Sequence, residues 1–266
     1  MAAEVADELL GRLLDTIHGY LALGNEVIDG PQVCFVRNTE VPDVYDANHV
    51  RYVRARTPKE IGAVLERADE VLAASRHRQF LIDPETPPSF EARLAMEGYE
   101  CNFEMAMVLE GELTAHPTPR GVSIRPVQSE ADWVALEKLF RANHEEEGRR
   151  SDRDALSPEV TRQVVVACKA RKAATFYVAS IRGTDCGYFS SWPGTNGMAK
   201  VEDLFTLADF RHRGIATALI HHCVEDARAR GAREVQISAR VDDTPKEMYA
   251  ALGFRPLAVL RSYLVS

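Results

Sequence analysis

The stretch VEDLFTLADFRHRGIATAL, residues 201–219, decides how the second half of this chain folds. Its first residues have the pattern of a strand, and the residues after Gly214 have that of a helix. Arg211, Gly214 and Ala216 form an R-x-x-G-x-A turn between them. The first amides of a helix lack intrahelical partners and carry the positive end of the helix dipole. The turn therefore suits a diphosphate, which Gly214 lets approach the backbone closely; an ordinary connecting turn is the alternative.

The sequence around this turn alternates strand and helix patterns. Ser129 and the pair Ser157-Pro158 have the chemistry of helix starts, while Gly231 and Gly253 are typical of helix ends. The polar residues 144–152 predict a loop between the first two helices. Strands are expected near 122–125, 174–182, 185–192, 198–207, 234–238 and 257–265, and helices after 129 and 157 and near 214–230 and 245–252. This order predicts the α/β class, with a mixed sheet.

Two prolines and a glycine within residues 116–121 predict a boundary, since they stop both helices and strands. We expect a first domain at 1–116, a linker at 117–121 and a second domain at 122–266. The first domain is expected to repeat the second in degenerate form, because Gly98 and Gly253 end similar strand–helix units 155 residues apart. A chance likeness between two α/β segments is the alternative.

Residues 122–266 resemble the GNAT superfamily of acetyltransferases. The likeness is carried by residues 123–127, by the strand–turn–helix quoted above and by Met248 to Phe254, which contains a Y-x-x-x-G-F element. It implies two tandem GNAT-like domains and an N-acetyltransferase that uses acetyl-CoA. It also implies a cofactor-binding set in which the pantetheine arm pairs with the backbone of the strand and the diphosphate meets the turn. That set is Leu204, Thr206, Arg211, His212, Arg213, Gly214, Ile215, Ala216 and Thr217.

Acetyl transfer to an amine needs a base for the ammonium group and an acid for the departing thiolate. The resemblance implies that Tyr249 is the acid; packing of its ring in the core is the alternative. Glu202 is the expected base, directly or through water, because it lies on the strand that lines the acyl site. The alternative is a structural ion pair. Tyr188 and Trp192 are equally compatible with the acceptor pocket and with the core.

Some residues depart from the family pattern. Asp242 stands where the family often has an asparagine that holds CoA, which puts that contact in doubt. In the first half, the segment equivalent to 211–216 is residues 56–61, which lacks glycine and contains Pro58. Leu94 stands at the position equivalent to Tyr249. We therefore expect a GNAT-like first half that binds no acetyl-CoA, as in tandem GNAT proteins in which one half has lost its cofactor.

Composition narrows the partners. The net charge of −8 argues against nucleic acid and favours a cationic or neutral substrate. The five cysteines are scattered, so neither a disulfide framework nor a zinc site is expected, and a metal site at His221-His222 is not expected either. The acidic run 145–147 is typical of a solvated helix end, with attraction of a cationic acceptor as the alternative.

The sequence patterns predict a cytoplasmic protein with no membrane partner. The resemblance implies an enzyme that acts on a primary amine of a small molecule or peptide. Monomer and homodimer both stay open. A non-catalytic acetyl-CoA sensor or assembly module is the competing function, although such a module needs neither Glu202 nor Tyr249.

Overall fold

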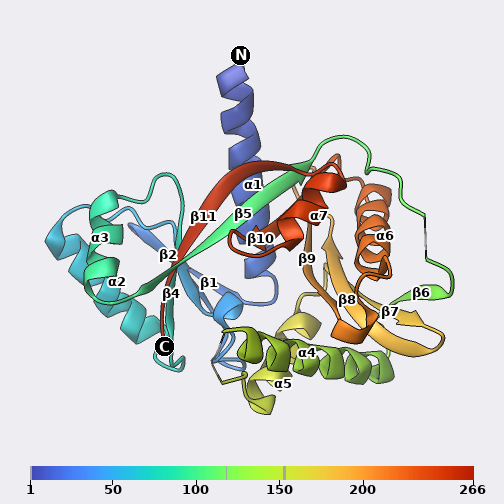
Figure 1. The fold of residues 1–266 in the computed structure, drawn as a ribbon. Helices are drawn as coiled ribbons and strands as arrows, with labels where there is room; N and C mark the ends of the chain where they lie inside the picture. The colour runs from blue at the N-terminus through green and yellow to red at the C-terminus, as the bar shows by residue number, and fades with distance from the viewer. Residues whose placement is uncertain (1, 118, 152–153) are drawn as a thin grey trace.

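The computed structural model describes residues 2–117, 119–151 and 154–266. Their strands form one 11-stranded sheet. Along the sheet the strands follow the order β1-β2-β3-β4-β11-β5-β10-β9-β8-β7-β6. The first half of the chain forms one side of the sheet and the second half the other, with β5 and β11 side by side between them (Figure 1). Thr118 of the expected linker and Asp152 of the expected loop lie outside the described residues.

The second half has the predicted order of elements and confirms the mixed α/β class. Its hydrophobic core lies between α6 and the strands, where Leu219, Ile220 and Cys223 pack against Val235 and Ile237. The elements are β6 (Val122–Pro126), α4 (Glu130–Ser151), α5 (Pro158–Ala170), β7 (Thr175–Ile181), β8 (Thr184–Trp192), β9 (Met198–Thr206), η2 (Ala208–Phe210), α6 (Ile215–Ala229), β10 (Glu234–Arg240), α7 (Pro245–Ala251) and β11 (Arg255–Val265).

The loop predicted at 144–152 is wrong over its described part, because α4 continues to Ser151. Glutamate and arginine are good helix formers, and the ion pair of Arg141 with Glu145 supports the helix at i,i+4 spacing. Gly148 does not break the helix. Its missing side chain makes room for Ala155, whose Cα lies only 2.7 Å from where a Cβ of residue 148 would stand.

The first half contains the same kinds of element at positions offset by 155 residues. Its α2 corresponds in this way to α6, β4 to β10, α3 to α7 and β5 to β11. The elements are α1 (Ala2–Ala22), β1 (Glu26–Gly30), β2 (Val33–Arg37), η1 (Tyr45–Ala47), β3 (His49–Arg51), α2 (Pro58–Val71), β4 (Arg78–Ile82), α3 (Pro88–Met96) and β5 (Glu100–Leu109).

The two halves exchange their last strands. Strand β5 of the first half pairs with β10, while β11 of the second half pairs with β4. The two exchanged strands also pair with each other, with Glu104 opposite Leu260 and Met105 opposite Val259. At the offset of 155, Glu104 corresponds to Val259 and Leu260 corresponds to Met105, so the repeat maps each of these two pairs onto the other. A pseudo-twofold axis therefore passes between them, next to Glu104.

Candidate active site

A β-bulge interrupts β9 at the expected acyl site. Tyr188 of β8 lies opposite Phe205, but Ser190 lies opposite Glu202, so one residue of β8 faces both Asp203 and Leu204. Asp203 has a φ of +68°, in the left-handed region. A bulge of this kind leaves the extra residue outside the regular ladder and redirects the neighbouring side chains and amides.

Strands β9 and β10 separate beside the bulge. Their parallel pairing ends at Lys200 and Gln236, although both strands continue beyond these residues. On its other side, β10 stays paired with β5 up to Arg240. The opening contains a cavity of about 210 Å³ that receives Glu202, Leu204 and Tyr249. An extended ligand could add there as a short extra strand.

The turn after β9 leaves backbone amides free at the start of α6. His212 and Gly214 both have left-handed backbones, with φ of +59° and +76°. The first amide of this helix that donates to the chain is that of Ala218, which bonds the Gly214 carbonyl at 3.0 Å. Among the described residues, no backbone bond is donated by the amides from His212 to Thr217. This run of unpaired donors suits a diphosphate.

The side chains of the turn fasten it to its surroundings. Arg211 donates to the Thr206 carbonyl at 2.9 Å and pairs with Glu146 of α4 at 2.5 Å. Arg213 lies 5.3 Å from the Phe210 ring, and Ile215 is buried in the core. The Thr206 hydroxyl is buried with no partner among the described atoms. The linker also reaches this point: Pro119 Cγ lies 2.9 Å from where a Cβ of Gly214 would stand.

Tyr249 is 4% exposed and lines the 210 Å³ cavity together with Glu202. It also packs against Phe254 in the core, with ring centroids 6.2 Å apart, and its role as the acid stays a prediction. Burial, and then the charges of Glu202 and Asp243, raise the pKa of the Tyr249 phenol. The hydroxyl therefore stays protonated at neutral pH and available as a donor.

Glu202 forms an ion pair with Lys200 two residues earlier on β9. Lys200 is buried, and its ammonium group also donates to the Gln236 side-chain carbonyl at 3.3 Å. The expected ion pair is present, and Glu202 also borders the 210 Å³ cavity; its role as the base stays a prediction.

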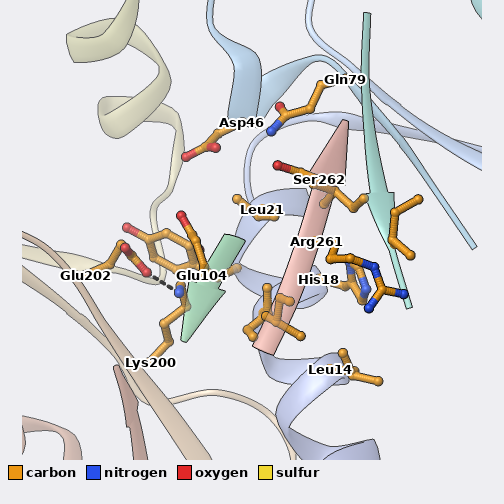
Figure 2. A pocket seen from close by; sticks show the side chains of 15 residues that line it. Leu14, His18, Leu21, Asp46, Gln79, Glu104, Lys200, Glu202, Arg261 and Ser262 are labelled. Atoms are coloured by element: carbon orange, nitrogen blue, oxygen red, sulfur yellow. Dashed lines mark ion pairs between the residues drawn. The ribbon is translucent and has the colours of Figure 1, made fainter. Parts of the chain in front are cut away.

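A second cavity of about 120 Å³ lies between the two halves and shares Glu202 with the first. Figure 2 shows Glu104 on β5 beside Glu202 and Lys200, with Asp46 farther along the same cavity. Glu104 borders both cavities and remains accessible to solvent there. Although part of the side chain is exposed, desolvation by the protein around it, and then the Glu202 carboxylate, raise the pKa of Glu104 to about 7. Sequence patterns did not identify this residue.

Asp203 belongs to a buried polar cluster that sequence patterns also missed. Tyr20 of α1 donates to the Asp203 carboxylate at 3.3 Å, and Arg171 donates to the Tyr20 hydroxyl at 3.4 Å. Arg171 in turn lies 3.7 Å from the Asp46 carboxylate. Burial, and then the Glu202 charge, raise the pKa of Asp203 to about 7. The cluster ties α1 and η1 of the first half to the bulge of the second.

The remaining aromatic and histidine candidates have structural contacts. Tyr188 accepts a hydrogen bond from Asn143 at 2.9 Å and packs against Phe140, although it also borders a cavity of about 270 Å³ next to Leu204. Trp192 packs against Tyr20 of α1. The His222 ring lies edge-on to Tyr177, with 4.5 Å between centroids.

The acidic candidates are paired with arginines. Glu145, Glu146 and Glu147 pair with Arg141, Arg211 and Arg240 respectively. Asp242 pairs with Arg240 at 3.0 Å, and Asp243 pairs with Arg150 at the same distance. The run 145–147 is thus part of a helix whose carboxylates pair with Arg211 of the turn after β9 and with Arg240 of β10.

The equivalent turn of the first half is closed by its own side chains. Thr57 and Glu60 form a capping box at the start of α2. The Glu60 carboxylate accepts from the amides of Thr57 and Arg56 at 2.8 and 3.0 Å, and Pro58 has no amide to offer. Leu94, the counterpart of Tyr249, is fully buried.

Among the described residues, no group of three or more histidines, cysteines, aspartates and glutamates could hold a metal ion. None of their helices combines the length and the apolar character that a membrane crossing requires.

Comparison with known proteins matches residues 133–254 to the acetyltransferase (GNAT) family. An uncharacterized N-acetyltransferase of Methanocaldococcus jannaschii is 32% identical over 96 residues, which cover 34% of this chain and 42% of that relative. An aminoglycoside N(6')-acetyltransferase type 1 of Acinetobacter genomosp. 13 is 29% identical over 136 residues, or 50% of this chain and 90% of the relative.

Among the solved structures that resemble nearly the whole chain is a tandem GNAT protein from the clavulanic acid biosynthesis pathway. The two structures superpose with a TM-score of 0.58 at 16% identity, over 97% of this chain and 95% of that one. At this identity the likeness concerns the fold. It extends the comparison to the first half, which the family match leaves out.

Proposed function

We propose, from the premise that this chain belongs to the GNAT superfamily of acetyltransferases, that it transfers an acetyl group from acetyl-CoA to a primary amine of a small molecule or peptide. The amine attacks the thioester directly, with no covalent intermediate on the protein. The observation that carries the proposal is the joint presence of unpaired amides after β9 and a cavity beside its bulge that holds Tyr249 and Glu202.

The proposed cofactor site follows β9 into α6. The amides of residues 212–217 receive the diphosphate, and the backbone of Leu204 and Thr206 pairs with the pantetheine arm in the gap between β9 and β10. Arg211 keeps the turn in position through Thr206 and Glu146. An amide at the bulge, near Leu204, stabilises the oxyanion of the thioester carbonyl.

The proposed acid is Tyr249 and the proposed base is Glu202, directly or through water. The buried phenol keeps its proton until the CoA thiolate departs. Glu202 attracts the ammonium group of the acceptor and helps to deprotonate it. The ion pair with Lys200 holds the Glu202 carboxylate at the edge of the cavity.

The charges around the site favour a cationic acceptor. Glu202, Glu104 and Asp46 border the cavity between the halves, where Lys200 and Arg261 are the cationic side chains among its described lining residues. Arg261 is already paired with Glu91 at 2.8 Å. The relative named as an aminoglycoside acetyltransferase acts, by that name, on polycationic amines, and we include this class among the acceptors.

The first half is proposed to bind no acetyl-CoA and to shape the acceptor side of the site. The capping box of α2 supports this role, because its side chains already occupy the amides of Thr57 and Glu60, the counterparts of His212 and Ile215. The first half also supplies Asp46, Glu104 and Tyr20 to the surroundings of Glu202 and Asp203.

Release of CoA thiol during incubation with acetyl-CoA and a panel of amines tests the enzyme. The panel contains aminoglycosides, linear polyamines, amino acids and peptides, and calorimetric titration with acetyl-CoA runs in parallel. We expect one acetyl-CoA bound per chain and turnover with at least one cationic amine. Binding without turnover across the panel would favour the competing function, a sensor or assembly module; absence of binding would overturn both.

A further inference from the structure

We propose that Glu104, a residue of the first half, is a further catalytic residue that takes up the proton released by the acceptor's ammonium group. This inference rests on the acetyl transfer proposed above. It assigns chemistry to the half of the chain that lacks the cofactor turn.

The strand exchange brings Glu104 to the reacting groups. Strand β5 lies between β10 and β11, and Glu104 is paired with Arg240 on one side and Leu260 on the other. Side chains alternate along a strand, so Glu104 shares a face with Ala106 and Val108. These two residues pack under α1, and Glu104 lies beyond them in the cavity where Glu202 also projects (Figure 2).

Glu104 differs from Glu202 in its partners. Glu202 is paired with Lys200. Glu104 has no hydrogen bond or ion pair with the residues that the structure describes. The surrounding protein and the nearby Glu202 charge instead favour its protonated form, with a pKa of about 7. A base of this strength is well matched to proton uptake at neutral pH.

The charged groups that surround Glu104 leave room for one more cation. The nearby cations already have other partners. Lys200 is paired with Glu202, Arg240 with Asp242 and Glu147, and Arg171 lies against Tyr20 and Asp46. Asp46 adds further negative charge to that of Glu202. Of the remaining ionisable groups at the cavity, His18 is neutral, because burial and then Arg51 lower its pKa to about 4, and Arg261 is paired with Glu91. The acceptor's ammonium group would supply the missing charge.

One proton passes from the ammonium group to the Glu104 carboxylate, directly or through Glu202 and water, and leaves a neutral amine. The nitrogen forms a bond to the thioester carbon while the carbon–sulfur bond breaks, and Tyr249 gives its proton to the thiolate. The second proton of the nitrogen returns to Tyr249. Glu104 then loses its proton to water through a wider cavity of about 560 Å³ that begins at its side chain.

The test compares two acceptors with the wild-type protein and with Glu104→Gln. The first acceptor is the best alkylamine of the panel. The second is its analogue with fluorine on the carbon next to the one that bears the amino group. This analogue is neutral at pH 7 and needs no deprotonation before attack. We expect Glu104→Gln to lower kcat/KM at pH 7 about 100-fold for the alkylamine and by less than about threefold for the analogue. Glu66→Gln, on the exposed side of α2, is the matched control.

The pH dependence gives the second readout. Below its pKa of about 7 Glu104 is protonated and cannot accept, so wild-type kcat/KM for the alkylamine should fall as pH decreases through 7. The fluorinated analogue should show no such fall, and Glu104→Gln should abolish it for the alkylamine. The wild-type profiles alone decide the matter if the variant does not fold.

Other outcomes separate the two proposals. Equal losses for both acceptors, a loss no larger than that of Glu66→Gln, or a wild-type profile that is flat near pH 7 would overturn the role of Glu104. A wild-type protein that neither binds acetyl-CoA nor acetylates any amine would instead overturn the proposed function. Unchanged acetyl-CoA affinity of Glu104→Gln shows that its cofactor turn is intact.

Discussion

Replacing Gly214 by alanine tests the proposed cofactor turn most directly. Gly214 has a φ of +76°, which costs an alanine roughly 1–2 kcal/mol. The new Cβ would also stand 2.9 Å from Pro119 Cγ, so either the linker or the turn must move. Movement of the turn displaces its amides. Loss of a single amide bond to a charged phosphate, at about 1.5–3 kcal/mol, weakens acetyl-CoA binding about 10- to 150-fold.

Gly231→Ala at the other end of α6 is the matched control. Its φ of +98° imposes a similar backbone strain, but no atom lies within 4 Å of the added Cβ. Urea unfolding should therefore show comparable losses of stability for both variants. Calorimetric titration with acetyl-CoA should show weaker binding for Gly214→Ala alone. Equal affinities, or equal losses in both variants, would refute the reasoning that residues 212–217 bind the diphosphate.

Three further predictions concern Tyr249, the Lys200–Glu202 pair and the α2 cap of the first half. Tyr249→Phe should lower kcat roughly 10- to 1000-fold in the CoA-release assay while acetyl-CoA affinity changes less than twofold; an unchanged rate would remove the phenol from the mechanism. Lys200→Met should cost about 2–3 kcal/mol of unfolding free energy, and adding Glu202→Gln should restore more than half of it; without such recovery in urea denaturation, the pair is not coupled. Thr57→Ala should cost about 1 kcal/mol through loss of the α2 cap without adding a second acetyl-CoA site, and a calorimetric stoichiometry of two would contradict the assignment of the first half.

Local chemistry made much of the second half predictable. Gly214 and Gly231 mark the two ends of α6, and Ser157 caps α5 at the predicted start. The turn at Arg182 and Gly183 joins β7 to β8 through two residues with left-handed backbones. Residues 144–151 were mispredicted because their polarity resembles that of a loop, whereas the ion pairs and the contact of Gly148 with Ala155 keep them helical.

Strand exchange was not predictable from the sequence. The repeat at 155 residues relates β5 to β11, but a repeat does not reveal which half each strand joins. The contribution of Glu104 depends on that choice, since only in the exchanged sheet does β5 border β10. One local indication existed: Glu104 is a charged residue on the same face of β5 as the apolar residues Ala106 and Val108. Glu202 and Tyr249 were identified as candidates because both lie within family motifs, and the structure places them at one cavity.

The exchange of β5 and β11 also affects what would happen if the connection between the halves were cut. Each fragment would still have a strand inserted in the sheet of the other, with β11 between β4 and β5 and β5 between β11 and β10. A nick in the connecting segment would consequently yield a noncovalent heterodimer rather than two free fragments. Neither half can be discarded by truncation, because each depends on the other for the strand that completes its sheet.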